Sequence, residues 1–143
     1  MSPHEMCLRL ALSPYPQRVP EVRDKVRARL TAWGIADQHD VLSVVGELAA
    51  NAVEHARDGG PIRVRVTLVE GAVQIAVEDG CPQLRPTPRE AGEDAERGRG
   101  LALVAALSRS WGCQSWGGRK TVWASISVPG RADAVPQASP AAA

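Results

Sequence analysis

The sequence predicts an α/β (α+β) two-layer sandwich, in which helices cover one face of a mixed, mostly antiparallel sheet. The first observation is the order of elements: strand, helix, helix, strand, strand, long loop, helix, strand, strand. The second is that the strand segments alternate apolar and polar residues, as strands do when only one face is buried. The third is that short glycine-containing turns join the paired strands, which is typical of antiparallel hairpins.

The first strand and the first helix follow from residue periodicity. Residues 7–12 (CLRLAL) alternate leucine with other residues, which predicts a strand. A helix follows over residues 20–33, because a proline is tolerated in the first turn and aliphatic residues recur at every fourth position. Gly34 ends this helix.

The second helix begins near an acidic cap and leads into the first hairpin. Asp37 or Asp40 is expected to cap a helix that runs to about Arg57. A turn follows at residues 58–61 (DGGP). A hairpin comes next, with strands at 62–68 and 73–78 joined by a turn at 70–71.

The last third of the chain contains a long loop, a helix and a second hairpin. Residues 80–97 are rich in proline, glycine and charge, and a loop of this length in a compact domain is usually functional or disordered. An apolar helix is predicted over 98–110, with glycines at its start. Two strands follow, at 111–116 and 121–128, around the turn Gly117–Gly118.

Composition predicts one cytoplasmic domain. The 143 residues fit a single core, here residues 1–129, with a disordered tail at 130–143 that is poor in large apolar residues. A net charge of +1 gives no electrostatic support for a nucleic-acid or membrane partner. The three cysteines form no CxxC pair, and no signal peptide or membrane-length apolar segment is evident, which favours reduced thiols in the cytosol.

The first chemical motif is ELAAN, residues 47–51. Glu47, Asn51 and His55 are spaced by four residues, so on a helix they share a face. An amide oxygen at Asn51 suits Mg²⁺, and a carboxylate one turn earlier could accept a proton from a nearby hydroxyl. A polar helix surface without chemistry is the alternative, and for this motif alone it carries more weight.

The second motif is Asp79-Gly80, at the end of a predicted strand. A carboxylate there can accept a hydrogen bond from an exocyclic amine such as that of adenine. An ordinary Asp-Gly turn is the alternative, and alone it is the stronger interpretation.

The third motif is Gly98-Arg99-Gly100-Leu101, at the start of the predicted third helix. Glycines let backbone N–H groups approach a phosphate, and a helix N-terminus favours negative charge. A glycine-rich helix entry without function is equally consistent. The spacing matches neither a P-loop nor a dinucleotide fingerprint.

Taken together and in this order, the three motifs resemble the GHKL ATP-binding superfamily, whose domain is the Bergerat fold. ELAANA is similar to its N box, VEDG to its first glycine box and GRGLALV to its second, and the resemblance covers nearly all of residues 7–128. Within the superfamily the chain resembles the small anti-sigma factor serine/threonine kinases. A detached histidine kinase domain or a topoisomerase or mismatch-repair ATPase fits less well, because neither a two-helix dimerisation segment nor a transducer domain is evident.

The resemblance implies ATP and Mg²⁺ as cofactors and gives each motif a role. Glu47 would be the general base, Asn51 would bind Mg²⁺ and Asp79 would hold adenine. Thr121 would lie beside the adenine, and residues 82–97 would form the ATP lid. Bordering the phosphates would be Gly98, Arg99, Gly100 and Leu101. His55 receives no step and is expected to be packed or to contact the lid.

One box departs from the family pattern. The family's first glycine box often reads Asp-x-Gly-x-Gly, whereas Cys81 and Gln83 stand at the two later glycine positions here. Close backbone approach to a nucleotide is less assured without those glycines.

The resemblance therefore implies a protein serine/threonine kinase that acts as an anti-sigma factor. Its partners would be a sigma factor and a STAS-type anti-anti-sigma protein, and a homodimer is a further expectation, with residues 20–33 as the partner or dimer surface. The altered glycine box motivates the alternative, a non-catalytic GHKL-fold module that sequesters its partner.

Overall fold

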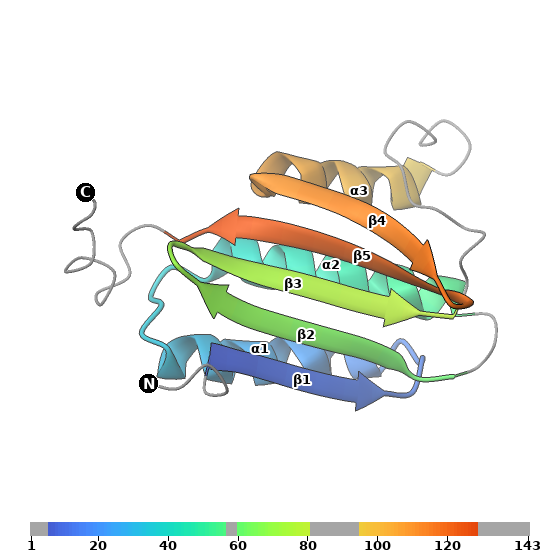
Figure 1. Ribbon diagram of the computed structural model, residues 1–143, viewed down its shortest axis with the longest axis horizontal. Coiled ribbons are helices and arrows are strands. Elements are labelled where there is room, and N and C mark those ends of the chain that lie inside the picture. Colours follow the sequence, from blue (N-terminus) through green and yellow to red (C-terminus); the bar gives the residue numbers. More distant parts are fainter. Residues whose placement is uncertain (1–5, 57–59, 81–94, 129–143) are drawn as a thin grey trace.

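The computed structural model describes residues 6–56, 60–80 and 95–128, with side chains in the last range described from Leu101 onward. The described elements follow the predicted order (Figure 1). They are β1 (Cys7–Leu12), α1 (Arg18–Ala32), α2 (His39–His55), β2 (Ile62–Val69), β3 (Ala72–Asp79), α3 (Ala95–Leu107), β4 (Ser110–Trp116) and β5 (Arg119–Ser127).

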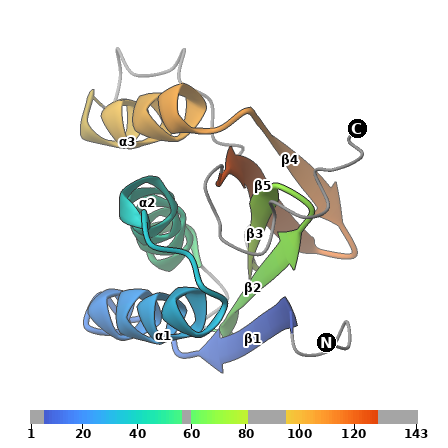
Figure 2. The ribbon, with the colours of Figure 1, turned by 90° about the vertical axis from the view of Figure 1, so that its left-hand side faces the viewer.

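The strands form a five-stranded sheet in the order β1-β2-β3-β5-β4, and each described pairing is antiparallel. Figure 2 shows the three described helices on one side of this sheet, with α2 between α1 and α3. The predicted two-layer α+β architecture is therefore confirmed. The opposite face of the sheet carries no helix among the described residues and is called the open face below.

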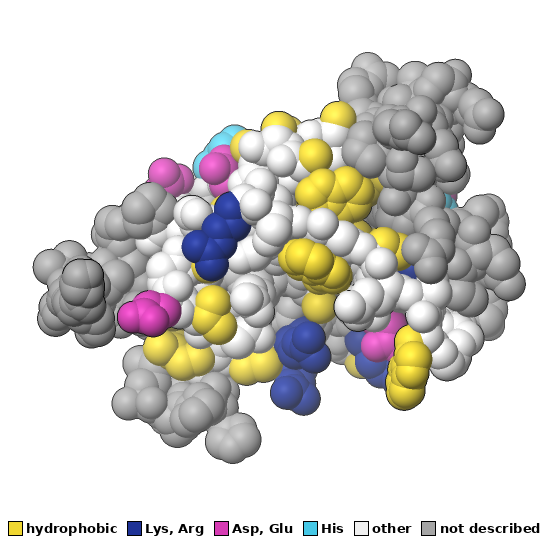
Figure 3. Space-filling model, turned by 45° about the horizontal axis from the view of Figure 1, so that its top comes forward, with side chains coloured by type: hydrophobic (Ala, Val, Ile, Leu, Met, Phe, Trp, Pro, Cys, Tyr) yellow, Lys and Arg dark blue, Asp and Glu magenta, His cyan; other side chains and the backbone are white. Residues whose placement is uncertain are grey.

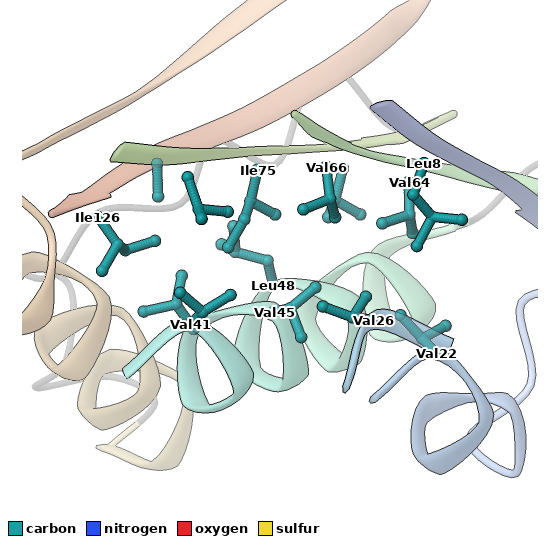
Figure 4. Close-up of a cluster of buried hydrophobic side chains, with 14 of the residues drawn as sticks. Leu8, Val22, Val26, Val41, Val45, Leu48, Val64, Val66, Ile75 and Ile126 are labelled. Atoms are coloured by element: carbon teal, nitrogen blue, oxygen red, sulfur yellow. The ribbon is translucent and has the colours of Figure 1, made fainter. Parts of the chain in front are cut away.

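The core fills the space between α2 and the sheet. Valines and leucine from α2 meet aliphatic side chains from the strands and from α1 (Figure 4). The strands contribute alternate residues, because successive side chains of a strand point to opposite faces. The most deeply buried members include Val22, Val26, Leu30, Val44, Val45, Leu48, Ile62, Val66, Ile75 and Ile126.

The predicted end of α1 at Gly34 is confirmed. Gly34 has a φ of +81°, a left-handed conformation that costs glycine little. The N–H of Gly34 donates to Thr31 O at 3.0 Å, and the N–H of Ile35 donates to Leu30 O at 3.0 Å. This pair of bonds is a Schellman motif, which satisfies the last carbonyls of the helix.

Several boundaries differ from the sequence predictions. Helix α2 has Gln38 as its N-cap residue with no side-chain cap, so neither Asp37 nor Asp40 caps it. Helix α3 begins at Ala95, so residues 95–97 of the predicted lid form its first turn. Alanine, glutamate and arginine all favour helix, which explains the earlier start. The rest of the lid, Cys81 and the tail at 130–143 lie outside the described residues.

Two of the three cysteines, Cys7 and Cys113, lie within the described residues. Cys7 is a free thiol. Burial opposes ionisation of Cys7, but hydrogen bonds from Arg9 and Thr67 and the charges of Arg9 and Arg65 lower its pKa.

Among the described residues, none of the helices is long and apolar enough to cross a membrane.

Gly112→Ala is expected to lower the free energy of unfolding by about 1–3 kcal/mol, the usual cost of overpacking. A Cβ at Gly112 would lie 2.9 Å from Cζ2 of Trp123, whose ring crosses this position on the neighbouring strand. Urea unfolding measures the change. Ser110→Ala, at an exposed position on the same strand, is the control and should change the free energy of unfolding by less than about 0.5 kcal/mol. An equally small change in Gly112→Ala would show that the Trp123 ring moves away without cost.

Candidate functional site

The last three turns of helix α2 carry the first predicted motif. Asn51 and His55 are buried, with exposed fractions of 8% and 1%, whereas Glu47 is half-buried. The three side chains stand one turn apart, as the sequence spacing predicts. A carboxylate, an amide and an imidazole therefore lie in sequence along one helix, with only the carboxylate partly open to solvent.

The amide oxygen of Asn51 is chemically unusual for a buried group. Among the described residues, Asn51 Oδ1 is buried and has no hydrogen-bond partner. A buried acceptor without a partner costs about 1–3 kcal/mol, so such an atom calls for a partner, such as a water molecule or a bound ion. An oxygen donor of this kind fits Mg²⁺.

Protein side chains alone do not complete a metal site here. Within the described ranges, no three His, Cys, Asp or Glu side chains come together in a way that could hold a metal ion. Mg²⁺ usually keeps few protein ligands and takes the rest from phosphates and water. Asn51 thus fits a magnesium ion that arrives with a nucleotide rather than one held by the protein alone.

Asp79, the second predicted site residue, ends β3 and faces the helices. Its exposed fraction is 1%. The residue directly opposite it on β5 is Lys120, whose exposed fraction is 0%. Lys120 Nζ lies 3.2 Å from Asp79 Oδ2, which makes a fully buried ion pair.

His55 joins this ion pair to α2. Lys120 Nζ lies 2.9 Å from His55 Nδ1. An ammonium group can only donate hydrogen bonds, so Nδ1 accepts and the ring proton is assigned to Nε2. The end of α2 and the paired positions on β3 and β5 thus meet in one buried polar cluster, formed by His55, Asp79 and Lys120.

The register turns Thr121 away from this cluster. Thr121 pairs with Glu78, and it lines cavities of about 410 and 540 Å³ on the open face, together with Arg65 and Gln114. Figure 3, turned so that the α3 and β4 side comes forward, shows Lys and Arg side chains scattered among hydrophobic ones. Thr121 and Asp79 therefore lie on opposite sides of the sheet, because neighbouring residues of a strand face opposite sides.

The third motif lies within α3 rather than at its start. Gly98, Arg99 and Gly100 are helical, and Leu101 packs into the core with 3% exposure. The N–H groups that lack an intrahelical acceptor belong to the N-cap residue and the first three helical residues, so in α3, which begins at Ala95, they end at Arg97. The N–H groups of Gly98 and Gly100 belong to the helical hydrogen-bond pattern, so an approach of either to a phosphate requires the first turn to open.

Sequence reasoning missed Lys120. The signal that could have found it is the alternation along β5, where Lys120 falls in phase with the buried Val122, Ala124 and Ile126. A charged residue in phase with a buried aliphatic row needs a partner of opposite charge.

Comparison with known proteins agrees with this architecture. The family model described as a histidine kinase-like ATPase domain matches residues 12–126. An uncharacterised protein of Streptomyces coelicolor, SCO4941, is 36% identical over 78 residues, which cover 53% of this chain and 74% of that protein.

Solved structures extend the similarity. The structure of the RsbU and RsbW domains of Rv1364c from Mycobacterium tuberculosis matches with a TM-score of 0.65 and 25% identity. The match covers 85% of this chain and 32% of that one, so this chain spans about a third of that structure. The histidine kinase AdeS of Acinetobacter baumannii matches with a TM-score of 0.52 and 16% identity, over 85% of this chain and 68% of that one, and shares the fold.

Proposed function

Because this chain belongs to the histidine kinase-like ATPase family, we propose that it binds ATP with Mg²⁺ and phosphorylates a serine or threonine of a protein partner. The observation that carries the proposal is the buried, unpartnered Asn51 Oδ1, one helical turn after the half-buried carboxylate of Glu47. Phosphoryl transfer to a hydroxyl needs an oxygen ligand for Mg²⁺ and a group that accepts the hydroxyl proton, and this helix carries both kinds of group.

Each residue has a defined part in this proposal. Asn51 would hold Mg²⁺, which neutralises phosphate charge when bound. Asp79 would accept a hydrogen bond from the adenine amine, and residues 98–101 would border the phosphates. Glu47 would take the proton from the substrate hydroxyl. The oxygen of that hydroxyl would bond to the γ-phosphorus while the bond to ADP breaks and ADP leaves.

The motif resemblance to anti-sigma factor kinases, together with the likeness to the structure of the RsbU and RsbW domains of Rv1364c, supports a role in transcription control. We propose that the chain binds a sigma factor and phosphorylates a STAS-type anti-anti-sigma protein. Co-purification with a sigma factor, and its release by the unphosphorylated STAS protein, would test these partners.

A non-catalytic module that sequesters its partner is the second candidate. The observation that favours it is the ion pair between Asp79 and Lys120, since a nucleotide would have to share or displace it. Nucleotide binding without turnover, or none at all in the folded protein, would distinguish this candidate from the kinase.

Asn51→Ala is expected to weaken Mg²⁺-dependent ATP binding by at least about tenfold, or about 1.4 kcal/mol. The reason is the loss of the oxygen ligand on α2. Calorimetric titration with ATP, once in Mg²⁺ and once in EDTA, measures the effect. The affinities of the wild type and Asn51→Ala should differ only in Mg²⁺. Gln74→Ala is the matched control, because it removes an exposed amide from the open face of the sheet. Equal Mg²⁺-dependent affinity in wild type and Asn51→Ala would exclude Asn51 as the metal ligand.

A further inference from the structure

We propose that the open face of the sheet binds an acidic segment of a protein partner, and that Arg9 and Arg65 hold its carboxylates. Figure 1 shows this face toward the viewer, in front of the helices. Asn51 and Asp79, which carry the proposed nucleotide binding, belong to the helix side of the sheet. The proposal therefore does not depend on the proposed function.

Arg9 and Arg65 form a like-charged pair on the open face. Strand pairing puts them directly opposite each other on β1 and β2, and both side chains are exposed. Like charges at directly opposite positions destabilise a sheet. In the parts of the chain that the structure describes, neither arginine forms an ion pair with a carboxylate, and Arg9 bonds to the sulfur of Cys7 instead. A bound carboxylate would relieve the repulsion between the two guanidinium groups.

Positive charge exceeds negative charge over the open face as a whole. Glu78 is the only carboxylate that the described strand residues place there, and it already pairs with Arg119 and, at 3.7 Å, with Arg63. The arginines that face this side or line its cavities are Arg9, Arg63, Arg65, Arg109 and Arg119. An acidic ligand complements this surface, and the forked guanidinium group suits carboxylates because it can donate two parallel hydrogen bonds.

The open face is also hollowed. Its cavities of about 410 and 540 Å³ adjoin, because Arg65, Ala76, Gln114 and Thr121 line both of them. The short side chain of Ala76 lies between Arg65 on β2 and Trp123 on β5 in the strand register. A protein segment can therefore lie in this hollow with carboxylates toward β1 and β2 and apolar groups toward Trp123.

The side chains around the hollow favour protein over nucleic acid as the ligand. Protein interfaces are enriched in aromatic residues and arginine and depleted in lysine. Trp123 is half-buried, Trp116 is 86% exposed on the same side, and the two lysines lie elsewhere, on α1 and inside the protein. Nucleic acid would bring phosphates toward Glu78, and a net charge of +1 gives little general attraction. A second copy of the chain would bring the same excess of arginine.

Fluorescence anisotropy with a labelled peptide tests the proposal. The probe is a peptide of about 20 residues with glutamate at every fourth position among alanine and leucine, so that the carboxylates share a helix face. The matched peptide has glutamine at those positions. Without ATP, the wild type should bind the glutamate peptide at least about tenfold more tightly than the glutamine peptide. Added salt should weaken this binding.

The double variant Arg9→Gln/Arg65→Gln should bind the glutamate peptide at least about tenfold more weakly than the wild type. Lys25→Gln/Arg27→Gln removes the same charge from exposed positions on α1 and should keep the wild-type affinity. Because the arginines repel each other, their removal should leave the urea midpoint of unfolding unchanged or raise it. A lower midpoint would assign the two arginines to the fold rather than to a ligand, and would overturn the proposal.

The other contrary results are equally decisive. The proposal is wrong if the wild type does not distinguish the two peptides, or if the arginine variant binds the glutamate peptide as the wild type does. A labelled DNA duplex that binds more tightly than the glutamate peptide would assign the face to nucleic acid. A doubled mass in light scattering that the arginine variant abolishes would assign it to a second copy. None of these results bears on the proposed function, since Mg²⁺-dependent ATP binding is measured separately and should be unchanged in the arginine variant.

Discussion

Glu47→Gln is expected to slow phosphoryl transfer by about 10²–10⁴, the usual contribution of a general base. Glutamine keeps the size and shape of the side chain but cannot take the proton of the substrate hydroxyl at neutral pH. Glu47 is half-buried on α2, so part of its side chain is accessible to a substrate. It lies one turn before Asn51, on the same face of the helix. Initial rates of phosphate transfer from ATP to the proposed STAS-type partner measure the effect.

A binding measurement separates chemistry from affinity. The dissociation constant for ATP with Mg²⁺ should change by less than about threefold in Glu47→Gln, because the variant removes a proton acceptor and not a ligand. Glu70→Gln is the matched control, since Glu70 is exposed in the turn between β2 and β3. A transfer rate in Glu47→Gln within about twofold of the wild type would show that another group accepts the proton.

Lys120→Met is expected to lower the free energy of unfolding by about 3–5 kcal/mol, the typical cost of removing one partner of a buried ion pair. Methionine fills much of the space left by the lysine stem, so cavity formation is a small part of the loss. The main cost is the Asp79 carboxylate, which would stay buried without its ammonium partner. Urea unfolding followed by circular dichroism measures the change.

The double variant Asp79→Asn/Lys120→Met identifies the cause. Asparagine removes the buried charge, so the double variant should lose less stability than the sum of the losses in Lys120→Met and Asp79→Asn, by an interaction free energy of about 0.5–3 kcal/mol. Additive effects of the two substitutions would mean that the side chains contribute separately, and would contradict a stabilising pair.

The sequence predicted the element order well because periodicity carries that information. Alternation in 62–68 and 73–78 corresponds to β2 and β3, and Gly34 ends α1 as expected. Predictions that depended on a single local signal were weaker. Neither Asp37 nor Asp40 caps α2, and the glycines at 98 and 100 do not begin α3. Cap choice and helix start depend on small energy differences that a pattern of hydrophobic residues does not encode.

The sequence by itself determined the two-layer architecture, the family and the face shared by Glu47, Asn51 and His55, since each depends on spacing within one segment. Only the tertiary structure decided what Asp79 meets. The pairing of β3 with β5 brings Lys120 to the helix side and turns Thr121 to the open face, and a slip of one residue would exchange the two. That register is set by packing between strands far apart in the chain, so the inward lysine and its ion pair with Asp79 could be recognised only after folding.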